Sequence, residues 1–279
     1  MFVVLRTVKP ANGFFKKKRQ KKNFELCEPV SFSTENGLPF FILDVLEDKS
    51  GINWSLTEEK CGRYVSRIVA PRSITLPDNR RLKRFVPGIS NGIFIFNTAL
   101  DIIKKAKIAP EAVSITVIDR NASINAEIHR LLPFASAVRV VTSRPDRYSP
   151  VCERIYNEFG ASIVIRPAYE PCDKKDIVIC CDGATSQSMQ NAAVFSFRRG
   201  IYGKIRFYCS GTELSEKHRE IIPDSIDSAD FASALTELCG STEYKSSTFS
   251  QTKINCNVCG DASAEKCLCC YIYGKGQNQ

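Results

Sequence analysis

The stretch Val113-Ser-Ile-Thr-Val-Ile118, followed by Asp119-Arg-Asn-Ala122, decides the fold. Its first six residues form a short apolar run rich in β-branched side chains, which predicts a buried strand. The next four residues predict a turn, and the spacing of the apolar residues after them predicts a helix over Ser123–Leu132. A strand, a tight turn and a helix in succession form the basic unit of a parallel sheet.

Similar units continue on both sides of this stretch. Helix 148–159 is followed by Gly160, the residue type that most often ends a helix in a left-handed conformation. Further strands are expected at 138–141, 162–165, 176–181 and 204–209, and further helices at 91–107 and 227–239. Strands that alternate with helices predict an α/β domain with a parallel sheet and helices on both faces.

Four segments of this region carry a family resemblance. Ser114–Asp119, Val140–Arg147, Asn157–Ala161 and Asp176–Gly183 together resemble the NAD(P)-binding, Rossmann-like domain of shikimate dehydrogenase and glutamyl-tRNA reductase. In that group the second strand ends in a short motif that carries an arginine. The resemblance implies that Ser143 and Arg144 hold the ribose 2′-phosphate of NADP, because a hydroxyl and a guanidinium suit that group.

The first turn departs from the family, because the chain has no glycine between Gly92 and Gly160. Dinucleotide-binding turns use glycine so that the backbone can approach the diphosphate. Here Asp119, Arg120 and Asn121 occupy the turn, and the Asp119 carboxylate would repel a diphosphate unless Arg120 screens it. An alternative is that Asn121 or Ser123 caps the following helix.

Two readings of the function follow. The resemblance implies an NAD(P)-linked oxidoreductase, whereas the missing glycines favour a non-catalytic binding or regulatory protein with a degenerate nucleotide site. Asp182 and Gly183 follow the fourth strand, at the edge where open α/β sheets bind ligands, although Asp-Gly is also an ordinary turn. The sequence identifies no catalytic residue. His129 and His218 both lie off the apolar faces of their segments, and His218, within an entirely polar stretch, is expected in solvent.

The N-terminal segment 1–88 is predicted to be a small, basic α+β unit. Residues 1–90 hold 17 Lys and Arg against nine Asp and Glu, so nearly all of the chain's formal charge of +9 lies there. A basic run flanked by Phe14, Phe15 and Phe24 can bind nucleic acid, through phosphate contacts and base stacking. The alternative is a solvated loop between strands. The basic residues of the run are Lys16, Lys17, Lys18, Arg19, Lys21 and Lys22.

The core domain is expected to span residues 89–240, and residues 241–279 are expected to be a cysteine-rich tail with little core of its own. Five of the thirteen cysteines fall within residues 256–270. Two C-x-x-C pairs, Cys256 with Cys259 and Cys267 with Cys270, predict a zinc site of four thiolates. The alternatives are a redox role and an incidental cluster. With a zinc site, the basic segment and the tail would together suit a nucleic-acid-associated protein.

Composition and hydropathy set the remaining expectations. A chain with 43% hydrophobic and 25% charged residues is typical of globular proteins. No apolar run approaches the length of a membrane span, and no signal peptide precedes the basic residues. We therefore expect a cytoplasmic protein without a membrane partner, in which cysteines within apolar strands, such as Cys180, Cys181 and Cys209, act as small hydrophobic residues.

Overall fold

The computed structural model divides the chain into two compact units, and each is considered by itself. Unit 1 comprises residues 1–88 and 214–242, and unit 2 comprises residues 89–213 and 243–279. The structure describes residues 1–33, 39–88, 90–171, 175–182, 189–197, 203–210, 212, 214–241, 244–245, 248–252 and 264–274. Among these residues, no helix is both long and apolar enough to cross a membrane.

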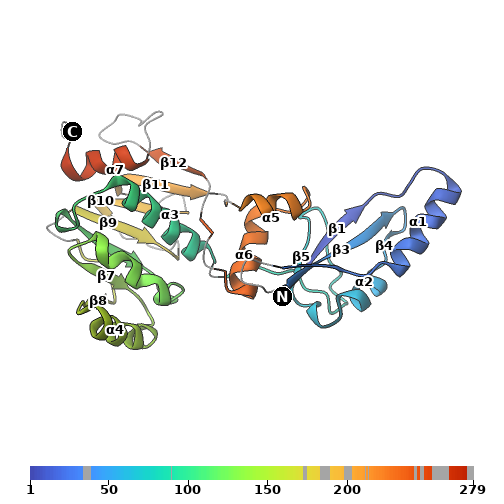
Figure 1. Cartoon of the computed structure of the whole chain (residues 1–279), viewed down its shortest axis with the longest axis horizontal. Coiled ribbons are helices and arrows are strands. Elements are labelled where there is room, and N and C mark those ends of the chain that lie inside the picture. Colours follow the sequence, from blue (N-terminus) through green and yellow to red (C-terminus); the bar gives the residue numbers. More distant parts are fainter. Residues whose placement is uncertain are drawn as a thin grey trace. The chain divides into compact units, whose positions relative to one another are not determined.

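Unit 1 is a mixed sheet with helices on both faces (Figure 1). Its strands lie in the order β2-β3-β1-β5, with β1 parallel to β3 and β5, and with β2 and β4 antiparallel to β3. Its strands are β1 (Val3–Val8), β2 (Val30–Ser33), β3 (Pro39–Asp48), β4 (Gly51–Ile52) and β5 (Ile68–Val69). Its helices are α1 (Phe14–Leu26), α2 (Trp54–Cys61), η1 (Gly62–Tyr64, 3-10), α5 (Glu216–Ile221) and α6 (Ser228–Cys239).

Helix α6 completes the core of unit 1, which the sequence did not predict. Phe2 stacks on Phe40 with ring centroids 5.5 Å apart, and Phe231 of α6 meets both rings edge-on. The alternate strand residues Val3 and Leu5 face the opposite way, toward a second apolar cluster. The expected domain 89–240 therefore differs from the structure, because α5 and α6 return to the N-terminal unit.

Unit 2 is built on a sheet with the strand order β12-β11-β10-β9-β6-β7-β8. All neighbours are parallel except β11 and β12. The strands are β6 (Val113–Ile118), β7 (Val138–Val141), β8 (Ile163–Arg166), β9 (Lys175–Cys180), β10 (Met189–Ser196), β11 (Gly203–Ser210) and β12 (Thr248–Thr252). The six parallel strands thus have the doubly wound order 3-2-1-4-5-6 of dinucleotide-binding domains, which supports the predicted Rossmann-like parallel sheet.

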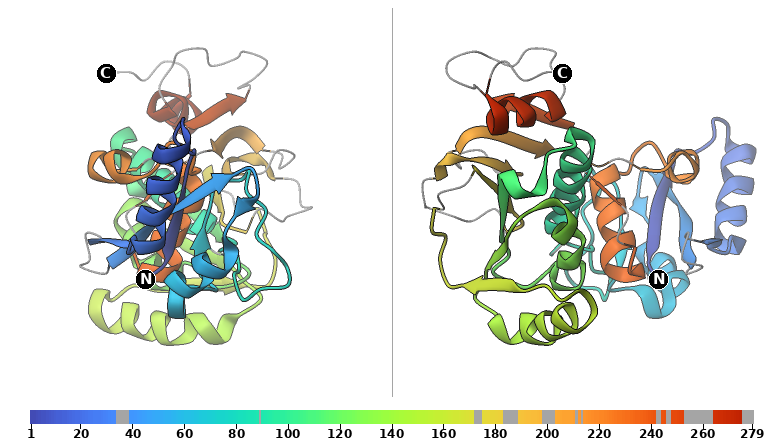
Figure 2. Two further views of the ribbon diagram at one scale, coloured as in Figure 1. Left: turned by 90° about the vertical axis from the view of Figure 1, so that its right-hand side faces the viewer. Right: turned by 60° about the vertical axis from the view of Figure 1, so that its left-hand side comes forward.

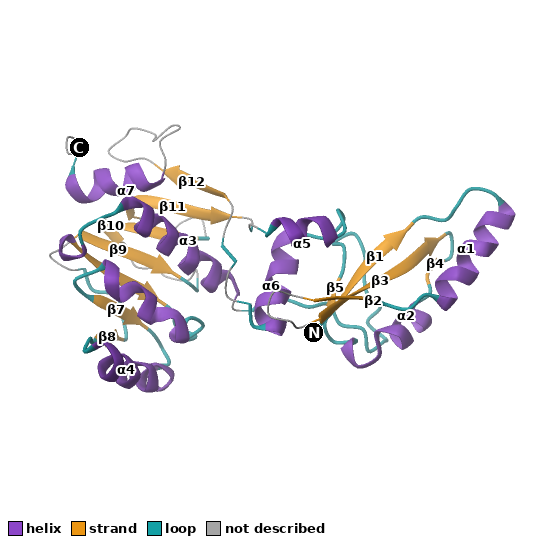
Figure 3. Ribbon diagram, viewed as in Figure 1, coloured by secondary structure: helices purple, strands orange, loops and turns teal. Residues whose placement is uncertain are grey.

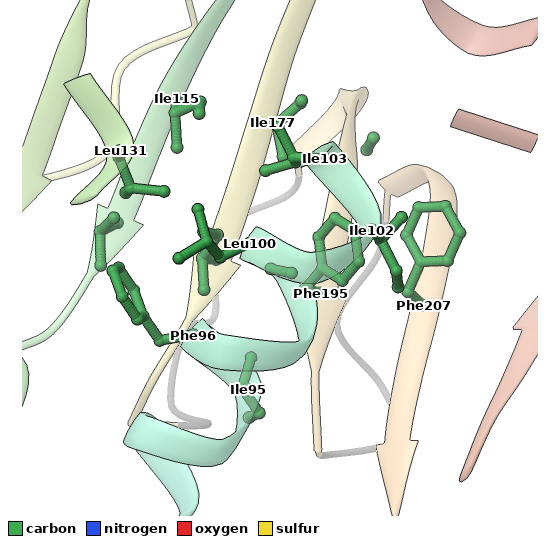
Figure 4. Close-up of a cluster of buried hydrophobic side chains, with 14 of the residues drawn as sticks. Ile95, Phe96, Leu100, Ile102, Ile103, Ile115, Leu131, Ile177, Phe195 and Phe207 are labelled. Atoms are coloured by element: carbon green, nitrogen blue, oxygen red, sulfur yellow. The ribbon is translucent and has the colours of Figure 1, made fainter. Parts of the chain in front are cut away.

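The helices of unit 2 pack over one face of this sheet (Figures 2 and 4). Phe96, Leu100 and Ile103 of α3 lie against Ile177 and Phe195 of the neighbouring strands (Figure 4). The helices are α3 (Ser90–Ala106), η2 (Pro110–Ala112, 3-10), η3 (Asn125–Phe134, 3-10), α4 (Pro145–Phe159) and α7 (Ala264–Tyr273).

The other face of the sheet carries a smaller apolar cluster, to which Tyr169 from the β8–β9 connection contributes. Within the described residues that cluster includes no helix, so the prediction of helices on both faces is wrong there. The bounds of the strands leave residues 167–174 between β8 and β9, 181–188 between β9 and β10, and 197–202 between β10 and β11. Each is shorter than the roughly dozen residues that a helical crossover needs.

The last described helix also corrects a prediction. Residues 264–273 form α7, and its Cys267, Leu268 and Tyr271 are buried in the same core as α3. The Tyr271 hydroxyl donates to the carbonyl of Asn191 at 2.5 Å, which ties α7 to β10. This part of the expected tail is therefore an integral layer of unit 2.

Candidate functional site

The candidate site lies at the carboxyl ends of β6 and β9. These strands are parallel neighbours, and the chain leaves β6 toward β7 but leaves β9 toward β10, on the opposite side. Such a switch point is where open α/β sheets bind their ligands. The turn Asp119–Ser123 follows β6, and Asp182 follows β9, so the structure brings these predicted residues together. Gly183 lies outside the described residues.

Asp119 is fully buried and serves as the internal acceptor of the turn. Its carboxylate accepts hydrogen bonds from Ser123 N and Oγ, both at 2.8 Å, from Ile124 N at 3.0 Å and from the Tyr148 hydroxyl at 2.6 Å. The prediction that Asn121 or Ser123 caps the next helix is wrong, because η3 begins after Ile124 and no side chain caps it. Asp119 instead holds the backbone of the turn before that helix. Burial is the main cause that raises the pKa of Tyr148 far above its usual value, and the Asp119 charge adds to it.

The turn contains the conformation that glycine usually provides, but at an alanine. Ala122 has a φ of 56°, in the left-handed region that side chains disfavour. The sequence did not predict a left-handed residue at Ala122, because alanine is not typical of that conformation.

Asp182 binds the backbone of this turn. Its carboxylate accepts a hydrogen bond from Arg120 N, and Asn121 N also contributes. Burial raises the pKa of Asp182, while these two backbone hydrogen bonds oppose that rise. Backbone N–H groups after the first strand are those that hold a diphosphate in dinucleotide-binding domains. In this protein the carboxylate of Asp182 accepts hydrogen bonds from two of these backbone N–H groups.

Helix α3 closes the same region from the other side. A Cβ atom on Gly92 would lie 2.9 Å from Ser123 Oγ and 3.1 Å from Cys181 Cβ, so the helix backbone contacts the turn directly. Cys181 and Cys180 are buried, and burial raises the pKa of the Cys180 thiol to about 12. These thiols are poor nucleophiles and act as the predicted small hydrophobic residues.

Ser143 and Arg144 lie on the exposed rim beside the turn. Ser143 N donates to the Arg120 carbonyl at 3.3 Å, so the loops after β6 and β7 are joined. Arg144 Nε lies 3.4 Å from the carboxylate of Asp146, and this contact is the first cause that lowers the pKa of Asp146. The two predicted phosphate ligands are therefore accessible, although Arg144 already has an anionic partner.

The two histidines differ in their surroundings. His129 is half-buried, and its Nδ1 lies 3.0 Å from the Ala126 carbonyl. His218 in unit 1 is fully buried, lies near the Phe231 ring and has its Nδ1 3.0 Å from Ser215 Oγ. The expectation of a solvated His218 is wrong, because α5 turns this residue toward the core of unit 1.

The predicted zinc ligands are only partly described. Cys256 and Cys259 lie outside the described residues, whereas Cys267 is 2% exposed within the core and Cys270 is half-buried. Over the part of the chain that the structure describes, no group of three or more Cys, His, Asp or Glu side chains is placed to hold a metal. The zinc site remains a prediction, and metal analysis of anaerobically purified protein tests it.

A separate cavity of about 270 Å³ lies in unit 1, between α1, β3 and α2. Two of its charged residues have partners: Asp44 binds Arg6, and Lys60 lies 3.4 Å from the carboxylate of Glu28. The switch point of unit 2 is the better candidate, because open α/β sheets bind ligands there.

No protein-family model and no curated protein matches the chain. Among solved structures, the chain is similar to the crystal structure of L-tryptophan dehydrogenase from Nostoc punctiforme, with 12% sequence identity and a TM-score of 0.29. The match covers 86% of this chain and 73% of that one. A similarity with this TM-score does not indicate a function. The class of the protein follows from its own strand order: it is an α/β protein with a doubly wound parallel sheet.

Proposed function

We propose that this is a non-catalytic binding or regulatory protein, whose Rossmann-like unit 2 has a degenerate nucleotide site. One observation carries the proposal: the Asp182 carboxylate accepts the N–H of Arg120. In dinucleotide-binding domains, backbone N–H groups of this turn are donors to the diphosphate. The turn fits that group poorly, because two anions would compete for the same donors.

The repulsion between the Asp182 carboxylate and a diphosphate can be given a magnitude. Two unit charges 4 Å apart repel by about 1 kcal/mol in water and about 4 kcal/mol near a protein surface. A diphosphate would also have to displace Asp182 from its backbone donors, which leaves a half-buried carboxylate with fewer hydrogen bonds.

The test is a thermal-shift panel with NAD⁺, NADP⁺, NADH and NADPH, each at 1 mM. A ligand at about 100 times its Kd stabilises the folded state by about 2.7 kcal/mol, so a Kd of about 10 μM would give a clear shift. We expect no shift with the wild-type chain. Stabilisation of the wild-type chain by any of the four would contradict the proposal.

The second candidate is an NADP-linked oxidoreductase, favoured by the exposed Ser143 and Arg144 beyond β7. For this candidate, NADPH but not NADH raises the melting temperature, and Arg144→Gln abolishes the shift. Arg154→Gln, an exposed arginine on the same helix as Asp146, is the matched control. The same panel thus separates the two candidates.

A further inference from the structure

The basic run forms helix α1, which lies beside β3 (Figure 3). Lys17 Nζ lies 4.0 Å from the carboxylate of Asp48, Gln20 donates to the Lys9 carbonyl at 3.0 Å, and Phe24 is half-buried. None of its thirteen residues is buried. The alternative of a loop is therefore wrong, and most of the helix surface faces solvent.

The exposed surface of α1 mixes aromatic and cationic side chains. Phe14 and Phe15 are 79% and 84% exposed, and their rings meet edge-to-face with centroids 5.7 Å apart. Phe15, Lys18, Arg19 and Lys22 recur at helical spacing, so they share one face. Lys16 and Lys21 are also exposed.

This helix is electrostatically unfavourable by itself. Lys17 with Lys21, and Lys18 with Lys22, are like-charge pairs four residues apart, each of which costs about 0.2–0.5 kcal/mol. No acidic residue lies in the first turn, and no side chain caps the helix, so three lysines lie near its positive end. An anionic partner on the exposed face would relieve both costs.

We infer that α1 is a binding surface for single-stranded nucleic acid. Its cations bind phosphates and release counterions, while the exposed Phe14 and Phe15 rings stack on unpaired bases. An anionic membrane fits less well, because membrane-surface helices separate an apolar face from a basic one. On α1, Phe15 lies on the same face as Lys18, Arg19 and Lys22. The inference is independent of the proposal for unit 2.

The test measures binding of the full chain to a fluorescein-labelled oligouridylate by fluorescence polarisation, across a range of salt concentrations. For single strands the logarithm of the binding constant falls with the logarithm of salt by about 0.7 per phosphate contact. The triple variant Lys18→Gln, Arg19→Gln, Lys22→Gln should therefore bind more weakly, with a slope shallower by about 2.

Phe15→Ala separates stacking from charge. It should weaken binding about fivefold or more, because each stacked base contributes about 1–3 kcal/mol, while the salt slope stays unchanged. Circular dichroism of each variant verifies that the helix remains, which is expected because the altered side chains are exposed.

A second triple variant, Lys49→Gln, Lys217→Gln, Arg219→Gln, removes the same charge from exposed positions of unit 1 outside α1. We expect it to bind as the wild-type chain does. An equal loss in both triples would overturn the inference, since net charge alone would then explain binding. Preferential binding to a duplex, or binding to phosphatidylserine vesicles without binding to the oligouridylate, would also overturn it.

Discussion

At the scale of single residues, Asp119 is the side chain on which the turn after β6 depends most. Asp119→Ala leaves the N–H groups of Ser123 and Ile124 and the hydroxyl of Tyr148 without their acceptor. We expect a loss of about 3 kcal/mol or more in the free energy of unfolding, measured in urea, because buried donors without partners cost about 1–3 kcal/mol each. Glu153→Ala, at an exposed carboxylate of α4, should cost less than about 0.5 kcal/mol. Equal losses would contradict this role of Asp119.

Buried thiols make stability sensitive to alkaline pH. Burial raises the pKa of Cys209 from 9.0 to about 12, so above pH 9 the unfolded chain loses a proton that the folded chain keeps. Since the folded state then binds more protons, the free energy of unfolding falls as pH rises, by about 1.4 kcal/mol per unit for each such thiol.

Cys209→Ala isolates this effect. Between pH 8 and pH 10.5 the wild-type chain should lose about 2 kcal/mol more than the variant, measured by urea unfolding at both values. The cavity that the substitution leaves lowers stability equally at both pH values and cancels in the difference. If the wild-type chain and Cys209→Ala had the same pH dependence, the Cys209 thiol would have the same pKa in the folded and the unfolded chain, which would contradict the prediction.

At the scale of elements, local sequence predicted the strands of unit 2 well. β6 and β7 have the expected bounds because their apolar, β-branched residues are buried and leave few alternatives. β10 was missed, since Met-Gln-Asn-Ala-Ala at its start has no strand pattern, and its burial comes from both neighbours in the sheet. α1 was expected as a loop or a nucleic-acid segment because charge runs carry no helical periodicity.

The candidate site was predictable in its location but not in its contacts. The edge where Asp119, Arg144 and Asp182 lie follows from strand order, which alternating segments predict. The hydrogen bond between Asp182 and Arg120 joins residues far apart in the chain, and no local pattern encodes such a pair. The same limit applies to Asp119, whose partner Tyr148 lies on α4.

The contact of α3 with the turn gives a prediction for an element. Alanine is normally the better helix former by about 1 kcal/mol, so Gly92→Ala would stabilise an exposed helix. Here the new Cβ would lie 2.9 Å from Ser123 Oγ and 3.3 Å from the Cys181 carbonyl oxygen. We expect a net loss of about 1–3 kcal/mol from overpacking, measured by urea unfolding.

Asn91→Ala is the matched control, at an exposed position of the same helix. It should stabilise or leave the protein unchanged, within about 0.5 kcal/mol. If Gly92→Ala were equally harmless, α3 would have room to shift, and the close contact with the turn would not constrain the site.

At the scale of the whole molecule, the chain passes between its units three times, so neither unit is a continuous segment. Unit 1 needs residues 214–242, because Phe231 of α6 covers Phe2 and Phe40, and Gly88 N donates to the Glu237 carboxylate at 2.9 Å. Local sequence could not reveal this return, since an amphipathic helix such as α6 fits either unit equally well.

The return of α6 gives the prediction for this scale: residues 1–88 alone should not fold cooperatively. Each large apolar side chain left exposed loses about 1.5–3 kcal/mol of stabilisation. In residues 1–88 alone, Phe2 and Phe40 both lose the ring of Phe231 that covers them. The same segment joined to residues 214–242 through a flexible Gly/Ser linker should regain a cooperative urea transition and lose the binding of a hydrophobic dye. A cooperative transition for residues 1–88 alone would contradict the assignment of α6 to this core. The assignment would also be contradicted if the linked protein stayed unfolded with both a short and a longer linker. The longer linker excludes strain in the linker as the cause.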